Sequence, residues 1–221
     1  MKNVFFCFFI IIIITINTKL CFGSNKHFPV IKMGINFNKF YSPKGDANIK
    51  IDKYPKFDYP LGYMAGLSWE KRLTKNLSFM PEMFYEKDIL EVTIYTGEEG
   101  ILDQKIINHY IRIPCLLKYQ MDWLFDIYVL GGIDLGFLLK SKYKYSDFIY
   151  RIKGEHNITN EMNRIDASLD CGLGMPLEIR DISFLVEVRY LIGLMEDTND
   201  YPLFEKWKTH SVQIIIGMKL N

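Results

Sequence analysis

The sequence predicts an all-β protein, an eight-stranded antiparallel transmembrane β-barrel with short periplasmic turns and long extracellular loops. Three observations support this. Apolar and polar residues alternate with a period of two along most of the chain, as in strands with two different faces. Such segments can be counted eight times. The connections between them are alternately short and long, which is typical of barrels that cross a membrane.

The N-terminal segment differs from the rest of the chain. A positively charged start is followed by an almost wholly apolar run from Val4 to Ile16, and Cys21 and Gly23 place small residues at a plausible cleavage site. We therefore predict a signal peptide over 1–23 and a barrel domain over 24–221. An uncleaved anchor helix is the alternative, but the apolar run is shorter than the ~20 residues that a spanning helix needs.

The expected strands follow one another to the end of the chain, and in each of them one face is more apolar than the other. In the first, Ile31 to Phe37 are apolar at odd positions, whereas Lys32 and Asn36 lie on the other face. The clearest alternation runs from 163 to 178, where every odd position from Ile165 to Leu177 is apolar. The eight segments are 29–40, 61–73, 77–89, 105–120, 123–141, 162–178, 181–195 and 210–221.

The connections support antiparallel closure. Tight turns are expected at 74–76, 121–122 and 179–180, and long polar loops at 42–60, 90–104, 142–161 and 196–209. A sheet in lipid cannot leave the N–H and C=O groups of its edges unpaired, so the last strand should pair with the first.

The polar face decides between two kinds of barrel. A soluble, lipocalin-like barrel would place the apolar face inside and the charges outside. The polar face is so rich in both acids and bases that we expect it to form a paired ionic core in a narrow lumen, with Gly132, Gly136, Gly172 and Gly217 leaving space for long side chains. The expected lumenal network comprises Glu70, Arg72, Glu82, Glu86, Arg112, Lys118, Asp126, Asp134, Arg164, Asp166, Asp170, Glu187, Arg189 and Lys219.

Charge and cysteine usage exclude several function classes. The net charge is +1, and removal of Lys2 and Lys19 with 1–23 changes it to −1, so no nucleic-acid partner is expected. Cys115 and Cys171 remain after cleavage, and their parity places both on the outer face of strands that are not neighbours. We expect two free thiols.

One segment carries a family resemblance. The run from Tyr110 to Tyr119, with Pro114 and Lys118, resembles the Y-[LI]-x-[IL]-P-x-L-[LI]-K-[YF] segment of the PorT-like outer-membrane β-barrel family. The segments 129–136, 170–174 and 217–220 are similar to glycine-containing strands of the same family. The resemblance implies an outer-membrane location and, through the founding member, a link to type IX protein secretion.

Catalytic and metal-binding patterns are weak. The four histidines, His27, His109, His156 and His210, form no spaced set with one another or with cysteine, so we expect no metal and no cofactor. A Ser–His pair such as Ser211 with His210 would suit a lipid-modifying enzyme, but no acid is placed to orient it. We expect no enzyme.

The resulting expectation is a monomeric barrel that contacts outer-membrane lipid and acts as a structural or interaction protein. An accessory role in type IX-like secretion, with partners from that machinery, is implied by the resemblance alone. A small pore or solute-binding barrel is the alternative, followed by a lipid-modifying outer-membrane enzyme.

Overall fold

A computed structural model describes most of the chain from residue 29 to residue 219. The segment 1–23, for which we predict a signal peptide, lies outside the described residues. The structure describes 29–41, 56–58, 60–96, 100–121, 126–147, 152–180, 182–195 and 208–219.

The described chain consists of strands. They are β1 (Val30–Tyr41), β2 (Lys56–Asp58), β3 (Leu61–Ser68), β4 (Lys71–Arg72), β5 (Leu77–Thr96), β6 (Gly100–Gln120), β7 (Tyr128–Asp147), β8 (Ile152–Asn157), β9 (Ile165–Ile179), β10 (Ile182–Gly193) and β11 (Lys208–Lys219). The described residues contain no helix that is both long and apolar enough to cross a membrane.

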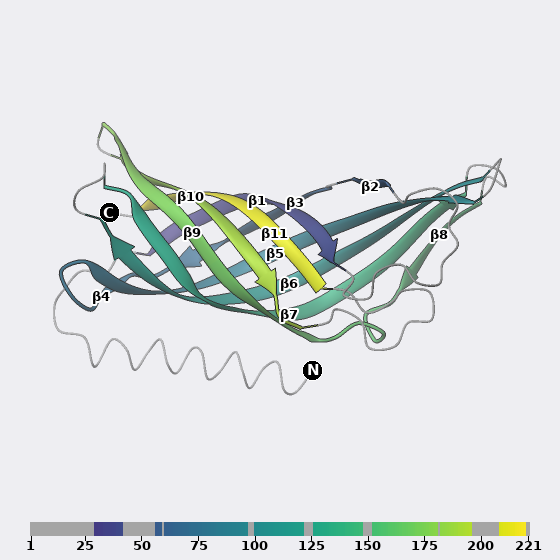
Figure 1. The fold of residues 1–221 in the computed structure, drawn as a ribbon, viewed down its shortest axis with the longest axis horizontal. Coiled ribbons are helices and arrows are strands. Elements are labelled where there is room, and N and C mark those ends of the chain that lie inside the picture. The colour runs from purple at the N-terminus through teal and green to yellow at the C-terminus, as the bar shows by residue number, and fades with distance from the viewer. Residues whose placement is uncertain are drawn as a thin grey trace.

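Eight of these strands close into an antiparallel barrel. Around the ring the order is β1, β11, β10, β9, β7, β6, β5 and β3, and β3 returns to β1. The first and last strands pair along their whole length, from Val30 with Lys219 to Tyr41 with Lys208. Closure satisfies the backbone groups that an open edge would leave unpaired in lipid. The predicted fold class is therefore confirmed (Figure 1).

The two faces of the strands have the predicted parity. In β9, Ile165, Leu169 and Leu173 are exposed on the outside, while Asp166 and Asp170 are buried inside. The outer wall carries exposed Leu, Ile, Val, Met and Tyr side chains on all eight barrel strands. An apolar outer wall around a charged interior is the arrangement of a barrel surrounded by lipid. Cys115 and Cys171 are free and face outward, as expected.

The barrel has a short end and a long end. At one end lie the start of β1, the end of β11 and the connections from β3 to β5, β6 to β7 and β9 to β10. Two of these connections contain a non-glycine residue with positive φ, Asp126 at 55° and Arg180 at 56°. This end is periplasmic in barrels of this kind, and the opposite end is extracellular.

The prediction of a long loop over 90–104 is wrong. β5 and β6 continue to pair through this region, from Leu90 with Ile106 to Thr96 with Gly100, so only 97–99 separates them. The β-branched and aromatic run from Val92 to Tyr95 favours strand over loop.

The expected loop over 142–161 is also partly strand, because β7 extends to Asp147 and pairs with β8. A sheet extends past the extracellular ends of β1, β10 and β11 (Figure 1). It consists of the outer parts of β5, β6 and β7, with β2 paired to β5 and β8 paired to β7. We call it the protruding sheet.

Candidate functional site: the lumenal network and the protruding sheet

Lumenal side chains form successive layers along the barrel axis. On β5 the inward positions are Met80, Glu82, Phe84, Glu86, Asp88 and Leu90, and all six are buried. Apolar and ionic layers therefore alternate. The two ionic layers are centred on two arginines, one on β10 and one on β6.

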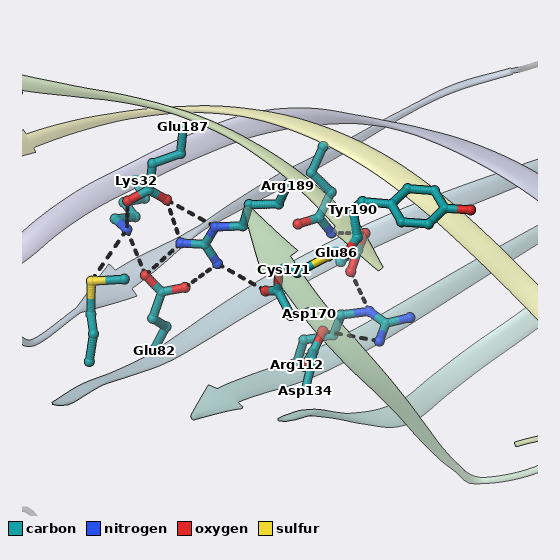
Figure 2. A network of polar contacts seen from close by, with 12 residues as sticks. Lys32, Glu82, Glu86, Arg112, Asp134, Asp170, Cys171, Glu187, Arg189 and Tyr190 are labelled. Carbon is teal, nitrogen blue, oxygen red and sulfur yellow. Dashed lines mark hydrogen bonds and ion pairs between the residues drawn. The ribbon is translucent and has the colours of Figure 1, made fainter. Parts of the chain in front are cut away.

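The first ionic layer, the Arg189 cluster, contains Lys32, Glu82, Asp170, Glu187 and Arg189. The Arg189 guanidinium donates to Glu82 through Nη1 at 2.6 Å and Nη2 at 3.0 Å, and through Nε to Glu187 Oε2 at 3.0 Å. Lys32 Nζ donates to Glu82 at 2.6 Å and to Glu187 at 2.7 Å. Glu82 and Glu187 each pair with both Lys32 and Arg189, so two carboxylates balance two cations (Figure 2).

This cluster crosses the lumen. Glu82 lies on β5 and Arg189 on β10, which are four strands apart in either direction around the ring of eight. A bidentate pair between these walls occupies the diameter of the barrel. Tyr128 on β7 adds a hydroxyl that donates to Glu187 at 2.9 Å, and its ring packs directly over Gly174, where a Cβ would lie 2.4 Å from it.

The second ionic layer, the Arg112 cluster, gathers acids around one guanidinium. Arg112 is paired with Glu86, with Asp166 at 2.8 Å and with Asp134 at 3.3 Å, and Asp88 lies 3.9 Å away. Asn36 on β1 donates to Glu86 and Asp88, and Gln213 on β11 donates to Glu86 at 3.2 Å.

The buried lumen carries an excess of acids. Among the described residues the buried cations are Lys32, Arg112 and Arg189, three in all. The buried carboxylic acids number seven, a formal difference of four: Glu82, Glu86, Asp88, Asp134, Asp166, Asp170 and Glu187. The formal charge of these buried side chains is therefore negative.

Apolar layers close both ends. At the extracellular end, Tyr110, Leu138 and Tyr143 pack with Ile158 and Met162 from the segment between β8 and β9. That segment is held to the wall by Thr159, whose hydroxyl accepts from the Ser141 backbone N–H at 2.9 Å. At the periplasmic end a second layer consists of Met80, Leu116, Tyr128 and Leu130.

The residues of the family-like segment line this interior. The Arg112 guanidinium lies 5.0 Å from the centroid of the Tyr110 ring. Pro114 has no N–H to donate, and the pairing of β5 with β6 is interrupted there between Pro81–Cys115 and Phe84–Arg112. Lys118 closes the periplasmic mouth, 4.3 Å from the Tyr128 ring centroid and 2.9 Å from Glu70.

The structure brings most, but not all, of the predicted network together. Glu82, Glu86, Arg112, Asp134, Asp166, Asp170, Glu187 and Arg189 are buried in the two clusters, and Glu70 pairs with Lys118 at the mouth. The prediction was wrong for Arg72, Asp126, Arg164 and Lys219, which are exposed. These four lie at strand ends or in turns, where a side chain reaches solvent instead of the packed lumen; Arg164, for example, donates to Asn160 at 2.8 Å.

The sequence prediction missed Lys32, Asn36, Asp88 and Gln213. All four have inward parity on their strands, so the signal was present in the alternation. Lys32 belongs to an otherwise neutral strand face, and only the closed barrel places it between two carboxylates.

The candidate catalytic pair is separated by the barrel wall. Ser211 is buried with inward parity, whereas His210 contacts Tyr190 on the outer wall at 3.0 Å. Adjacent residues of a strand point to opposite faces, so these two cannot act together. No group of three or more His, Cys, Asp or Glu side chains within the described ranges is arranged to hold a metal ion.

The protruding sheet carries an open recess of about 550 Å³. Its lining is mainly charged: Glu91, Lys105, Lys144, Tyr145, Ser146, Lys153, Gly154 and Glu155. Glu155 on β8 pairs with Lys142 and with Lys144 at 2.9 Å, and these hydrogen bonds lower the pKa of the Glu155 carboxyl to about 2. The Tyr145 ring stacks on His156, with centroids 5.9 Å apart.

A closed barrel with an apolar outer wall and a buried ionic lumen defines an integral β-barrel protein of the outer membrane. Residues 30–199 match the family model described as outer membrane protein beta-barrel domain. The chain belongs to this family and is located in the outer membrane.

Solved structures with a similar fold are remote in sequence. Ail, the attachment invasion locus protein of Yersinia pestis, is 12% identical with a TM-score of 0.42, covering 89% of this chain and all of Ail. Neisserial surface protein A is 10% identical with a TM-score of 0.40, covering 87% and 97% of the two chains. OprG of Pseudomonas aeruginosa is 11% identical with a TM-score of 0.34, covering 89% and 95%. No curated protein matches the sequence.

Proposed function

We propose that this protein is a closed membrane scaffold that holds the protruding sheet outside the cell for contact with a protein partner. The observation that carries the proposal is the bidentate Arg189–Glu82 pair across the lumen. Arg189 and Lys32 are no more than 1% exposed, so the lumen is filled at this level and does not offer a route for ions.

The protruding sheet supports the interaction role. It is built by strands of 20, 21 and 20 residues, whereas about 10 residues suffice to cross a bilayer in a tilted strand. Within the described chain, β8 pairs with β7 only, which leaves its other edge open to strand addition. The charged recess beside this edge, with Lys144 and Lys153, offers side-chain contacts to the same partner.

Two measurements test the scaffold. The refolded protein in a planar bilayer should show no steady conductance, whereas the double variant R189A/E82A should conduct. Steady conductance by the unmodified protein would favour the pore alternative instead. Crosslinking in cells from a photoreactive residue at Asn157 should capture a specific protein. The same residue placed at Glu178, on the periplasmic side, is the control and should not capture it.

An accessory role in type IX-like secretion is a narrower form of this proposal. It rests on the PorT-like segment from Tyr110 to Tyr119, in which Tyr110 and Pro114 face the lumen. A deletion strain should then accumulate secretion substrates in the periplasm. If the protruding sheet is the contact, complementation with K142A/K144A should not restore secretion. Normal secretion in the deletion strain would remove this narrower role and leave the scaffold proposal intact.

A further inference from the structure

A basic row crosses the outer wall near the extracellular end of the apolar band. Lys87 on β5 is in register with His109 on β6, and His109 is in register with Lys140 on β7. All three have outward parity, because Asp88 next to Lys87, Asn108 and Tyr110 on either side of His109, and Ser141 next to Lys140 are buried inside. We call Lys87, His109 and Lys140 the basic row.

A β-bulge brings Lys140 into this row. The register of β6 and β7 shifts between His109, which pairs with Lys140, and Tyr110, which pairs with Leu138. Leu138 is buried, so plain alternation would direct Lys140 into the lumen as well. The extra residue, Leu139, reverses the parity, and both Leu139 and Lys140 are exposed on the outer wall. A bulge at this position re-aims one lysine toward the lipid side.

The other two residues of the basic row, Lys87 and His109, each contact a tyrosine. Lys87 Nζ lies 5.2 Å from the centroid of the Tyr63 ring, and Tyr63 is its register partner on β3. The Tyr85 hydroxyl contacts His109 Nδ1 at 2.6 Å. When Nδ1 accepts the hydroxyl proton, the ring proton is on Nε2, which then serves as an N–H donor. Among the described residues, no ion pair joins Lys87 or Lys140 to a carboxylate.

The row lies where the apolar wall ends. One row nearer the membrane centre, Tyr85, Ile111 and Phe137 are in register and apolar or aromatic. One row farther out, Lys142 already pairs with Glu155 of the protruding sheet. Tyrosines at this level are typical of the membrane–water interface. The basic row therefore lies at the depth of the lipid headgroups of the extracellular leaflet.

We propose that the basic row binds the phosphate of an anionic lipid headgroup in the extracellular leaflet. Two ammonium groups and one N–H donor are presented in a line across three strands, which are about 4.8 Å apart. Among the residues that the structure describes, neither ammonium group is paired with a carboxylate, and phosphate complements their positive charge. This inference depends on the outer-membrane location and is independent of the interaction role of the protruding sheet.

Lipid retention tests the proposal. The protein is refolded in phosphatidylcholine vesicles that contain one part in four of phosphatidic acid, and bound lipid is counted by native mass spectrometry. Each lysine near an anionic lipid surface contributes a factor of about five to binding, so K87A/K140A should retain about twenty-five-fold less phosphatidic acid. The matched control K105A/K153A also removes two positive charges, but from the protruding sheet. It should retain as much phosphatidic acid as the unmodified protein.

Three further readings complete the experiment. The heat-modifiable gel shift reports that each variant is folded, and K87Q/K140Q replaces K87A/K140A if the latter fails to fold. Equal retention by the unmodified protein and the folded row variant would overturn the proposal, as would an equal loss in K105A/K153A. Inorganic phosphate added to pure phosphatidylcholine vesicles should not raise the unfolding temperature; a rise equal to that with phosphatidic acid would show a site for free phosphate instead.

Discussion

Arg189 on β10 and Glu82 on β5 form a bidentate ion pair from opposite walls of the barrel, with Nη1–Oε2 and Nη2–Oε1 distances of 2.6 and 3.0 Å (Figure 2). Lys32 also pairs with Glu82, and Glu187 also pairs with Arg189. The contact therefore links distant strands through the centre of the lumen, where backbone pairing cannot act. Its removal should affect both the stability and the permeability of the barrel.

Loss of one partner should destabilise the barrel strongly. R189A leaves Glu82 and Glu187 buried with Lys32 as their common cation, and breaking a buried pair in this way costs about 3–5 kcal/mol. The free energy of unfolding, measured in urea by tryptophan fluorescence in lipid vesicles, should fall by that amount. R164A removes an exposed arginine and should leave it nearly unchanged. Equal stability of the two variants would contradict a structural role for the cluster.

Loss of both partners should open a cation-selective path. In R189A/E82A the two side chains that span the lumen are gone, while six of the seven buried acids remain. Under a potassium chloride gradient the reversal potential should therefore have the sign of potassium permeation. Anion selectivity would show that the remaining acids do not face the path. R164A, which removes an exposed arginine, is the control for the loss of an arginine alone.

A side chain at Gly174 should displace Tyr128. A Cβ there would lie 2.4 Å from the Tyr128 ring, so G174V should cost about 1–3 kcal/mol of unfolding free energy through overpacking. The same ring donates its hydroxyl to Glu187, and that contact would be lost as well. G131V is the matched control, because a Cβ at Gly131 meets no atom within 4 Å. A stability loss in G131V as large as in G174V would point to a general effect of valine.

The β7–β8 pairing should weaken in acid. Hydrogen bonds from Lys142 and Lys144 lower the pKa of Glu155 from 4.5 to about 2. A carboxyl whose pKa is depressed by folding contributes its stabilisation above the unfolded pKa and loses it as the pH falls through the folded one, here between about 4.5 and about 2. Spin labels at Ser146 and Lys153 should report a broader distance distribution over this range. E155Q should be broad at every pH, and a transition that persists in E155Q would assign it to another group.

The parity of the strands was predictable because alternation is a local property of the chain. Ile165 and Leu169 outside, with Asp166 and Asp170 inside, follow from a period of two and from the rule that lipid excludes charge. The same rule found most of the lumenal acids and both lumenal arginines. It failed at strand ends and turns, as at Arg72 and Asp126, because side chains at the end of the barrel are exposed to solvent instead of packed in the lumen.

The sequence by itself determined eight strands, their faces and their antiparallel order, because each depends on neighbouring residues and on connection length. Only the tertiary structure decided that Lys32 lies between Glu82 and Glu187, that β5 and β6 pair beyond the membrane to Thr96 and Gly100, and that Lys140 faces outward. The physical reason is that these features depend on how strands meet when the barrel closes. The stagger between strands and a single bulged residue set which side chains share a level, and neither is encoded in the alternation of one strand.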